Sequence, residues 1–132
     1  MIEQNRAEFE KCRIPEYHAA GRLGQGITIA VLDDNKKPLP FMNYVEHPFG
    51  WLEKTKQHHS TKVIRVIHEV APKARIISLP YINEATTQIQ NASIQWILDH
   101  SDEIDFINCS FHEWENDIFK RLQVLDIPIV CA

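Results

Sequence analysis

The stretch GQGITIAVLDDN, residues 24–35, decides the fold. After two glycines that mark a turn, residues 27–32 form a nearly continuous apolar run that is rich in β-branched side chains. Such a run is typical of a strand that is buried on both faces, as the strands of a parallel sheet are. The run ends at Asp33, so this strand should deliver an acid to the carboxyl edge of the sheet, where the sites of α/β proteins lie.

The rest of the chain alternates helical and strand-like segments. Helical spacing of apolar residues predicts helices over residues 60–71, 86–100 and 115–125, and short apolar runs predict strands over 75–79, 106–109 and 127–131, with a further edge strand at 41–45. Strands that alternate with helices in this way predict an α/β fold: a doubly wound parallel sheet of four to five strands with helices on both faces.

The length of 132 residues and the hydrophobic content of 44% are typical of a single domain, here residues 1–132, that buries its own core. Residues 1–22 are expected to form a helical leader that packs on this domain. The leader would contain two short helices that are separated at Ile14-Pro15, with Phe9 as its main apolar anchor.

Composition and charge exclude several classes of function. The net charge is -4 and no run of basic residues is longer than two, so no nucleic acid is expected as a partner. The sequence contains neither a signal-peptide pattern nor the roughly 18 consecutive apolar residues of a membrane span, which predicts a cytoplasmic protein without membrane contact. The three cysteines lack metal-binding spacing, so we expect buried, reduced thiols and no cofactor.

A second stretch, HHSTKVIRVIHEVAPKARI over residues 58–76, places a histidine at the start of a helix. Ser60 or Thr61 is a natural N-cap for that helix, and His59 stands just before it. Asp33 and His59 should therefore meet at the carboxyl edge of the sheet. A carboxylate that accepts a hydrogen bond from imidazole Nδ1 fixes the tautomer of the ring and stabilises its protonated form, which a general base requires.

These two stretches resemble the aspartate and histidine segments of the subtilisin-like serine proteases. HSTKV, residues 59–63, is similar to the HGTHV motif of that family, and the likeness continues in order through HEVAPKARIISL (68–79), ASIQWILDHSDEIDFINCSF (92–111) and IPIVCA (127–132). The resemblance implies a catalytic dyad of Asp33 and His59. It also implies a substrate-binding edge, which is formed by Asn108, Ser110 and Phe111.

The sequence departs from the family pattern beside the dyad. Asp34-Asn35 stands where the family has Thr or Ser followed by Gly, although asparagine tolerates the left-handed conformation of that glycine. Ser60 replaces the glycine of the histidine motif, and Lys62 replaces its second histidine. A cation at this place disfavours a protonated imidazole, so the base should be weakened.

The resemblance stops before the family's oxyanion asparagine and nucleophilic serine. Ser110 is the one serine expected at the carboxyl edge beside Asp33, and by resemblance it is a substrate-strand residue. We therefore expect a non-catalytic pseudoprotease that binds a protein, with half of a split protease, completed by a partner chain, as the alternative. A protein partner or a second copy of the chain would bind along the edge strand Ile127 to Cys131.

Two other interpretations of the acidic pair compete with the dyad. Asp33, Asp34, His58 and His59 could together ligate a metal, but no HExxH or CxxC spacing supports this, and no metal site is expected. An acidic pair after the first strand is also similar to the Mg²⁺ site of response-regulator receiver domains. Receivers need an aspartate and a lysine at the ends of later strands, where this chain has Pro80-Tyr81 and Cys131-Ala132.

Overall fold

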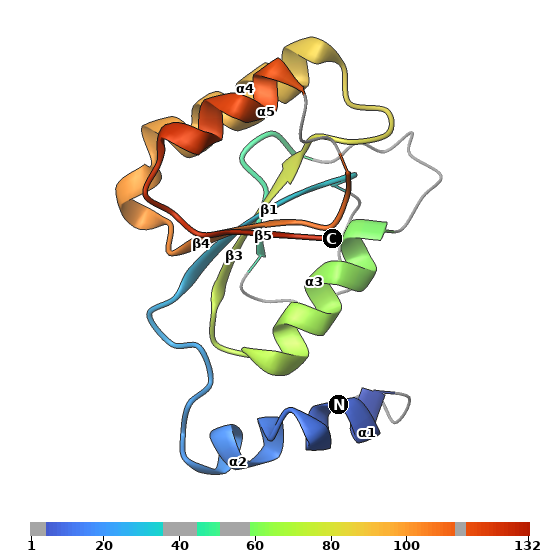
Figure 1. The fold of residues 1–132 in the computed structure, drawn as a ribbon, viewed down its shortest axis with the longest axis vertical. Coiled ribbons are helices and arrows are strands. Elements are labelled where there is room, and N and C mark those ends of the chain that lie inside the picture. The colour runs from blue at the N-terminus through green and yellow to red at the C-terminus, as the bar shows by residue number, and fades with distance from the viewer. Residues whose placement is uncertain (1–4, 36–44, 51–58, 113–115) are drawn as a thin grey trace.

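The computed structural model describes residues 5–35, 45–50, 59–112 and 116–132. Their centre is an all-parallel sheet of five strands in the order β2-β3-β1-β4-β5 (Figure 1). The strands are β1 (Thr28–Asp33), β2 (Val45–Glu46), β3 (Arg75–Pro80), β4 (Phe106–Cys109) and β5 (Ile129–Cys131). The α/β class and the parallel sheet that were predicted from the sequence are confirmed. Of the predicted edge strand at 41–45, only the last residue lies inside the described part of the chain, where it begins β2.

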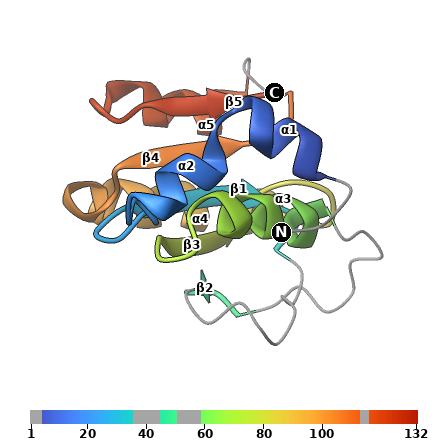
Figure 2. The same ribbon diagram turned by 90° about the horizontal axis from the view of Figure 1, so that it is seen from below.

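Helices cover both faces of the sheet, as in a doubly wound fold. Figures 1 and 2 show α3 on one face and α4 with α5 on the other. The helical elements are α1 (Arg6–Lys11), α2 (Ile14–Ala19), α3 (His59–Val70), α4 (Thr87–Asp99), η2 (Ser101–Glu103), α5 (Asp117–Lys120) and η3 (Arg121–Val124). The predicted helix over 115–125 is therefore a short α-helix that continues as a 3₁₀ helix. None of the described helices is long and apolar enough to span a membrane.

The central strand β1 is buried along its whole length, because it contributes to the core on both sides of the sheet. Ala30 and Leu32 belong to the apolar cluster beneath α4 and α5, and Ile29 and Val31 belong to the cluster beneath α3. Side chains that alternate between two covered faces explain why the sequence of β1 is almost continuously apolar.

The register of the sheet determines where polar chemistry can lie. Asp33 pairs with Pro80 at the end of β3, and Leu32 pairs with Cys109 at the end of β4. The carboxyl ends of these three strands consequently form one edge. The helix α3 also begins at that edge, at His59.

The leader contacts the opposite end of α3. His18 on α2 forms a hydrogen bond of 2.8 Å, through Nε2, with the carbonyl oxygen of Val70, and Lys73 N–H donates to the carbonyl of Leu23. Figure 1 shows the leader beyond the C-terminal end of α3. Phe9 is buried, as expected for its anchor.

The three cysteines are free thiols in different surroundings. Cys109 is buried within β4, and burial raises the pKa of its thiol. Cys12 and Cys131 are exposed, so the expectation that the thiols are buried is wrong for these two residues. Cys131 is exposed because β5 is an edge strand of the described sheet.

Gly24 is required by the close approach of the segment before β1 to the turn after α3. Its φ is +81°, and a Cβ atom built there would lie 2.7 Å from the Cβ of Ala71. Gly26 has nearly the same φ of +80°, but a Cβ atom there would meet nothing within 4 Å. A substitution at either glycine therefore strains the backbone, but only a side chain at position 24 would also clash with Ala71.

We predict that Gly24→Ala lowers the free energy of unfolding by about 1–3 kcal/mol more than Gly26→Ala does, because overpacking a tight contact costs that much. Urea unfolding of the two variants, followed by circular dichroism, measures this difference directly. Equal losses would show that the contact between Gly24 and Ala71 is not tight.

Candidate active site at the carboxyl end of β1

Three consecutive polar side chains at the end of β1 are completely buried: Asp33, Asp34 and Asn35 are each 0% exposed. Burying polar groups costs free energy unless they form hydrogen bonds, and for charged groups the cost is large. Each of the three bonds to a different part of the protein. Together they connect the central strand to α3, to β3 and to residues 47–50.

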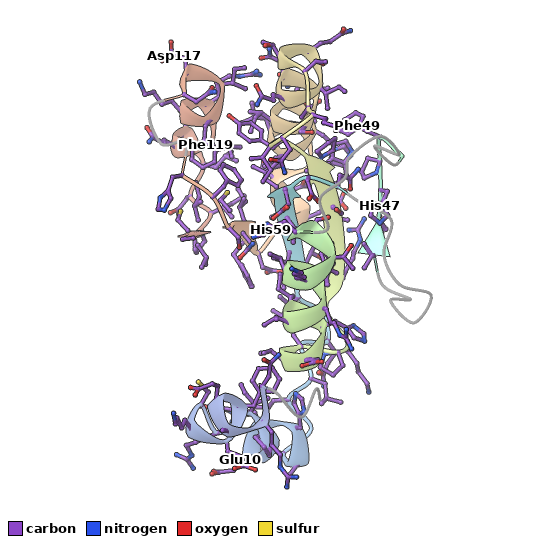
Figure 3. The ribbon with its side chains drawn as sticks, turned by 90° about the vertical axis from the view of Figure 1, so that its right-hand side faces the viewer. Glu10, His47, Phe49, His59, Asp117 and Phe119 are labelled. Atoms are coloured by element: carbon purple, nitrogen blue, oxygen red, sulfur yellow. The ribbon has the colours of Figure 1, made fainter. Side chains whose placement is uncertain are left out.

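Asp33 binds the imidazole of His59. The Nδ1 atom of His59 lies 3.0 Å from Oδ1 and 2.9 Å from Oδ2 of Asp33. An ionised carboxylate only accepts hydrogen bonds, so Nδ1 carries the hydrogen and Nε2 is the basic nitrogen of the neutral ring. The structure thus brings together the two residues that the sequence proposed as a dyad, and Figure 3 shows His59 at the start of α3.

The two members of this pair differ in their access to solvent. The side chain of His59 is 42% exposed, whereas that of Asp33 is fully buried. Among the described residues, none forms a hydrogen bond with Nε2 of His59. The basic nitrogen is therefore the part of the dyad that another group can reach.

Burial raises the pKa of the Asp33 carboxyl. The Asp34 N–H, which donates to Oδ1 at 2.7 Å, and the ring of His59 act in the opposite direction, and the nearby carboxylate of Asp34 raises the pKa further. Ionised Asp33 is consequently held in this place at a cost to stability.

Asp34 caps the N-terminus of α3 from a distant strand. Its Oδ2 accepts the backbone N–H of His59 at 3.0 Å, and its Oδ1 accepts the N–H of Ser60 at 3.1 Å. The first N–H groups of a helix lack partners within the helix, and a negative charge there is favourable. The prediction of Ser60 or Thr61 as N-cap is wrong, because the helix begins earlier, at His59, and the capping carboxylate belongs to Asp34, the residue after β1.

Asn35 connects the end of β1 to β3 and to residues 47–50. Its φ of 51° lies in the left-handed region, which asparagine tolerates. Its Oδ1 accepts a hydrogen bond from Ser78 Oγ at 2.7 Å and lies 3.0 Å from His47 Nδ1, and its Nδ2 donates to the carbonyl of Gly50 at 2.6 Å. Burial lowers the pKa of His47 to about 4, so this ring is neutral near pH 7.

Sequence reasoning missed His47 and Ser78 as parts of this site. A serine within the otherwise apolar run of β3 was the available signal, because a buried hydroxyl needs a partner. No comparable signal identifies His47, whose partner Asn35 lies 12 residues away.

The three residues proposed as a substrate-binding edge are divided between the two faces of the sheet. Asn108 Nδ2 donates to Ser110 Oγ at 3.1 Å, and both residues line a hollow of about 320 Å³ whose other wall is α3. Phe111 instead packs under α4 and α5, where its ring stacks on Tyr81 with centroids 5.3 Å apart. Alternation of side chains along an extended chain accounts for this division.

The carboxylates of Asp33 and Asp34 are both hydrogen-bonded within the protein. All four carboxylate oxygens of Asp33 and Asp34 accept hydrogen bonds from protein N–H groups. Within residues 5–35, 45–50, 59–112 and 116–132, no three His, Cys, Asp or Glu side chains are grouped to hold a metal ion. His58, which completed the metal alternative, lies outside the described residues.

Comparison of the sequence with protein-family models finds no match, and comparison with curated proteins finds none either. The resemblance to subtilisin-like proteases therefore rests on the sequence motifs alone and stays a prediction.

We predict that Asp33→Asn reverses the tautomer of His59. The carboxamide can still accept the Asp34 N–H through its oxygen, but its NH₂ group then faces Nδ1 and donates to it, which moves the ring hydrogen to Nε2. Long-range ¹H–¹⁵N spectra of the histidine rings measure the tautomer. The wild-type protein should have Nδ1 protonated, and an unchanged pattern in the variant would contradict this account.

Proposed function

We propose that this chain carries the acid and base of a subtilisin-like serine protease site. The observation that supports the proposal is the pairing of a fully buried carboxylate with Nδ1 of a half-exposed imidazole, at the carboxyl edge of a parallel sheet. This arrangement leaves Nε2 of His59 basic and accessible. The nucleophilic hydroxyl would come from a segment or a partner chain that is not among the described residues.

The chemistry follows from the two nitrogen atoms of the ring. Nε2 of His59 would take the proton of the incoming hydroxyl as its oxygen attacks a peptide carbonyl, and it would later give that proton to the departing amine. Asp33 would stabilise the positive charge that the ring carries between these steps. Ser110 is not the nucleophile in this proposal, because it accepts a hydrogen bond from Asn108 and lines the hollow beside α3.

A second candidate is the non-catalytic protein-binding module that was expected from the sequence, and the position of β5 favours it. Among the described strands, β5 pairs with β4 alone, and its central residue Val130 is 52% exposed. The strand Ile129–Cys131 has no charged residue, and charged residues are a common protection against edge pairing. A protein partner or a second copy of the chain could add a strand there.

Both candidates keep the expectation of a cytoplasmic protein. The free state of all three cysteines supports it, because thiols stay reduced in that compartment.

A fluorophosphonate probe, which labels activated serines, separates the two candidates. We predict labelling of a serine in the assembly that copurifies with the chain from native cells. The labelling should be lost in His59→Ala, by a factor on the order of 10³ or more, because a nucleophile without its base is not activated. His100→Ala is the matched control, since the ring of His100 bonds to the carbonyl oxygen of Trp96 at the C-terminal end of α4 and not to Asp33 or His59.

Absence of labelling in every copurified assembly would reject the protease proposal and favour the binding module. Equal loss of labelling in both histidine variants would show that the effect is not specific to the dyad.

A further inference from the structure

We propose that Asp34 is a positioning residue of this site: it fixes the backbone of His59, as Asp33 fixes the ring. The role of Asp34 in catalysis rests on the function proposed above, whereas its control of the ring of His59 can be measured without any nucleophile. The family that the sequence resembles has Thr or Ser at this place, so the carboxylate is a feature of this chain.

The contacts of Asp34 are specific to the first turn of α3. One carboxylate oxygen accepts the N–H of His59, and the other accepts the N–H of Ser60. A serine or threonine hydroxyl offers one oxygen, whereas the carboxylate offers two, so both N–H groups are bonded at once. The side chain of Asp34 is 0% exposed, so water does not compete for these bonds.

The two acids hold His59 as one unit. Asp34 N–H donates to Asp33 Oδ1 at 2.7 Å, and Asp33 in turn contacts the ring through both oxygens. Asp33 therefore determines the position of the His59 ring, and Asp34 determines the position of the His59 backbone. Displacing reacting groups by about 1 Å can cost 10²-fold in rate, so this double restraint is functionally important.

The test compares Asp34→Ala and Asp34→Asn with the wild-type chain by the Nδ1–H resonance of His59. We expect Asp34→Ala to accelerate solvent exchange of this proton roughly five- to tenfold, the factor that corresponds to the loss of a helix cap. Asp34→Asn, which keeps one acceptor oxygen, should give a smaller acceleration. If the alanine variant does not fold, the asparagine variant alone decides.

Thr86→Ala is the matched control, because Thr86 caps α4 by accepting the N–H of Ile89. This variant should lose less stability than Asp34→Ala, because Thr86 is exposed and accepts a single N–H group, and it should leave the His59 signal unchanged. A folded Asp34 variant with wild-type exchange of that proton would overturn the proposal, as would an equal effect of Thr86→Ala. Failure of fluorophosphonate labelling would reject the protease function but would leave this result intact.

Discussion

The hydrogen bonds made by the buried polar end of β1 are the constraint on which the rest of the structure depends. Asp33, Asp34 and Asn35 follow the most buried strand of the sheet, and none of them contacts solvent. Their partners lie on α3, on β3 and in residues 47–50. Since unpaired polar groups in this position would be costly, the three side chains fix the relative positions of these elements.

Local patterns predicted the fold and the contact between Asp33 and His59. The apolar run of residues 27–32 identified the central strand, and the alternation of helices with strands identified the parallel sheet, because both signals depend on the periodic burial of side chains. Asp33 and His59 could be paired from sequence because each ends or begins an element, and such ends meet at one edge of a parallel sheet.

The parts that sequence did not predict depend on contacts between distant residues. Asp34 caps a helix that begins 25 residues later, and no local pattern distinguishes it from a solvent-exposed acid. Asn35, His47 and Ser78 likewise come from three separate segments. Phe111 was assigned to the same edge as Ser110, but neighbouring residues of an extended chain face opposite sides, and its aromatic ring packs in the core instead.

The proposed function requires an ionised Asp33, and burial makes this charge a cost to stability. Burial raises the pKa of Asp33 in the folded state, so the folded protein holds this proton more tightly than the unfolded chain does. The free energy of unfolding therefore falls as the pH rises above about 4, the pKa of an aspartate in the unfolded chain. The free energies of unfolding of the wild-type protein and Asp33→Asn, measured from pH 4 to pH 8, test this claim most directly. The variant should be at least as stable as the wild-type protein at pH 7, with an advantage that shrinks toward pH 4. A loss of about 3 kcal/mol or more at pH 7 would contradict it, since that is the cost of breaking a structural buried ion pair.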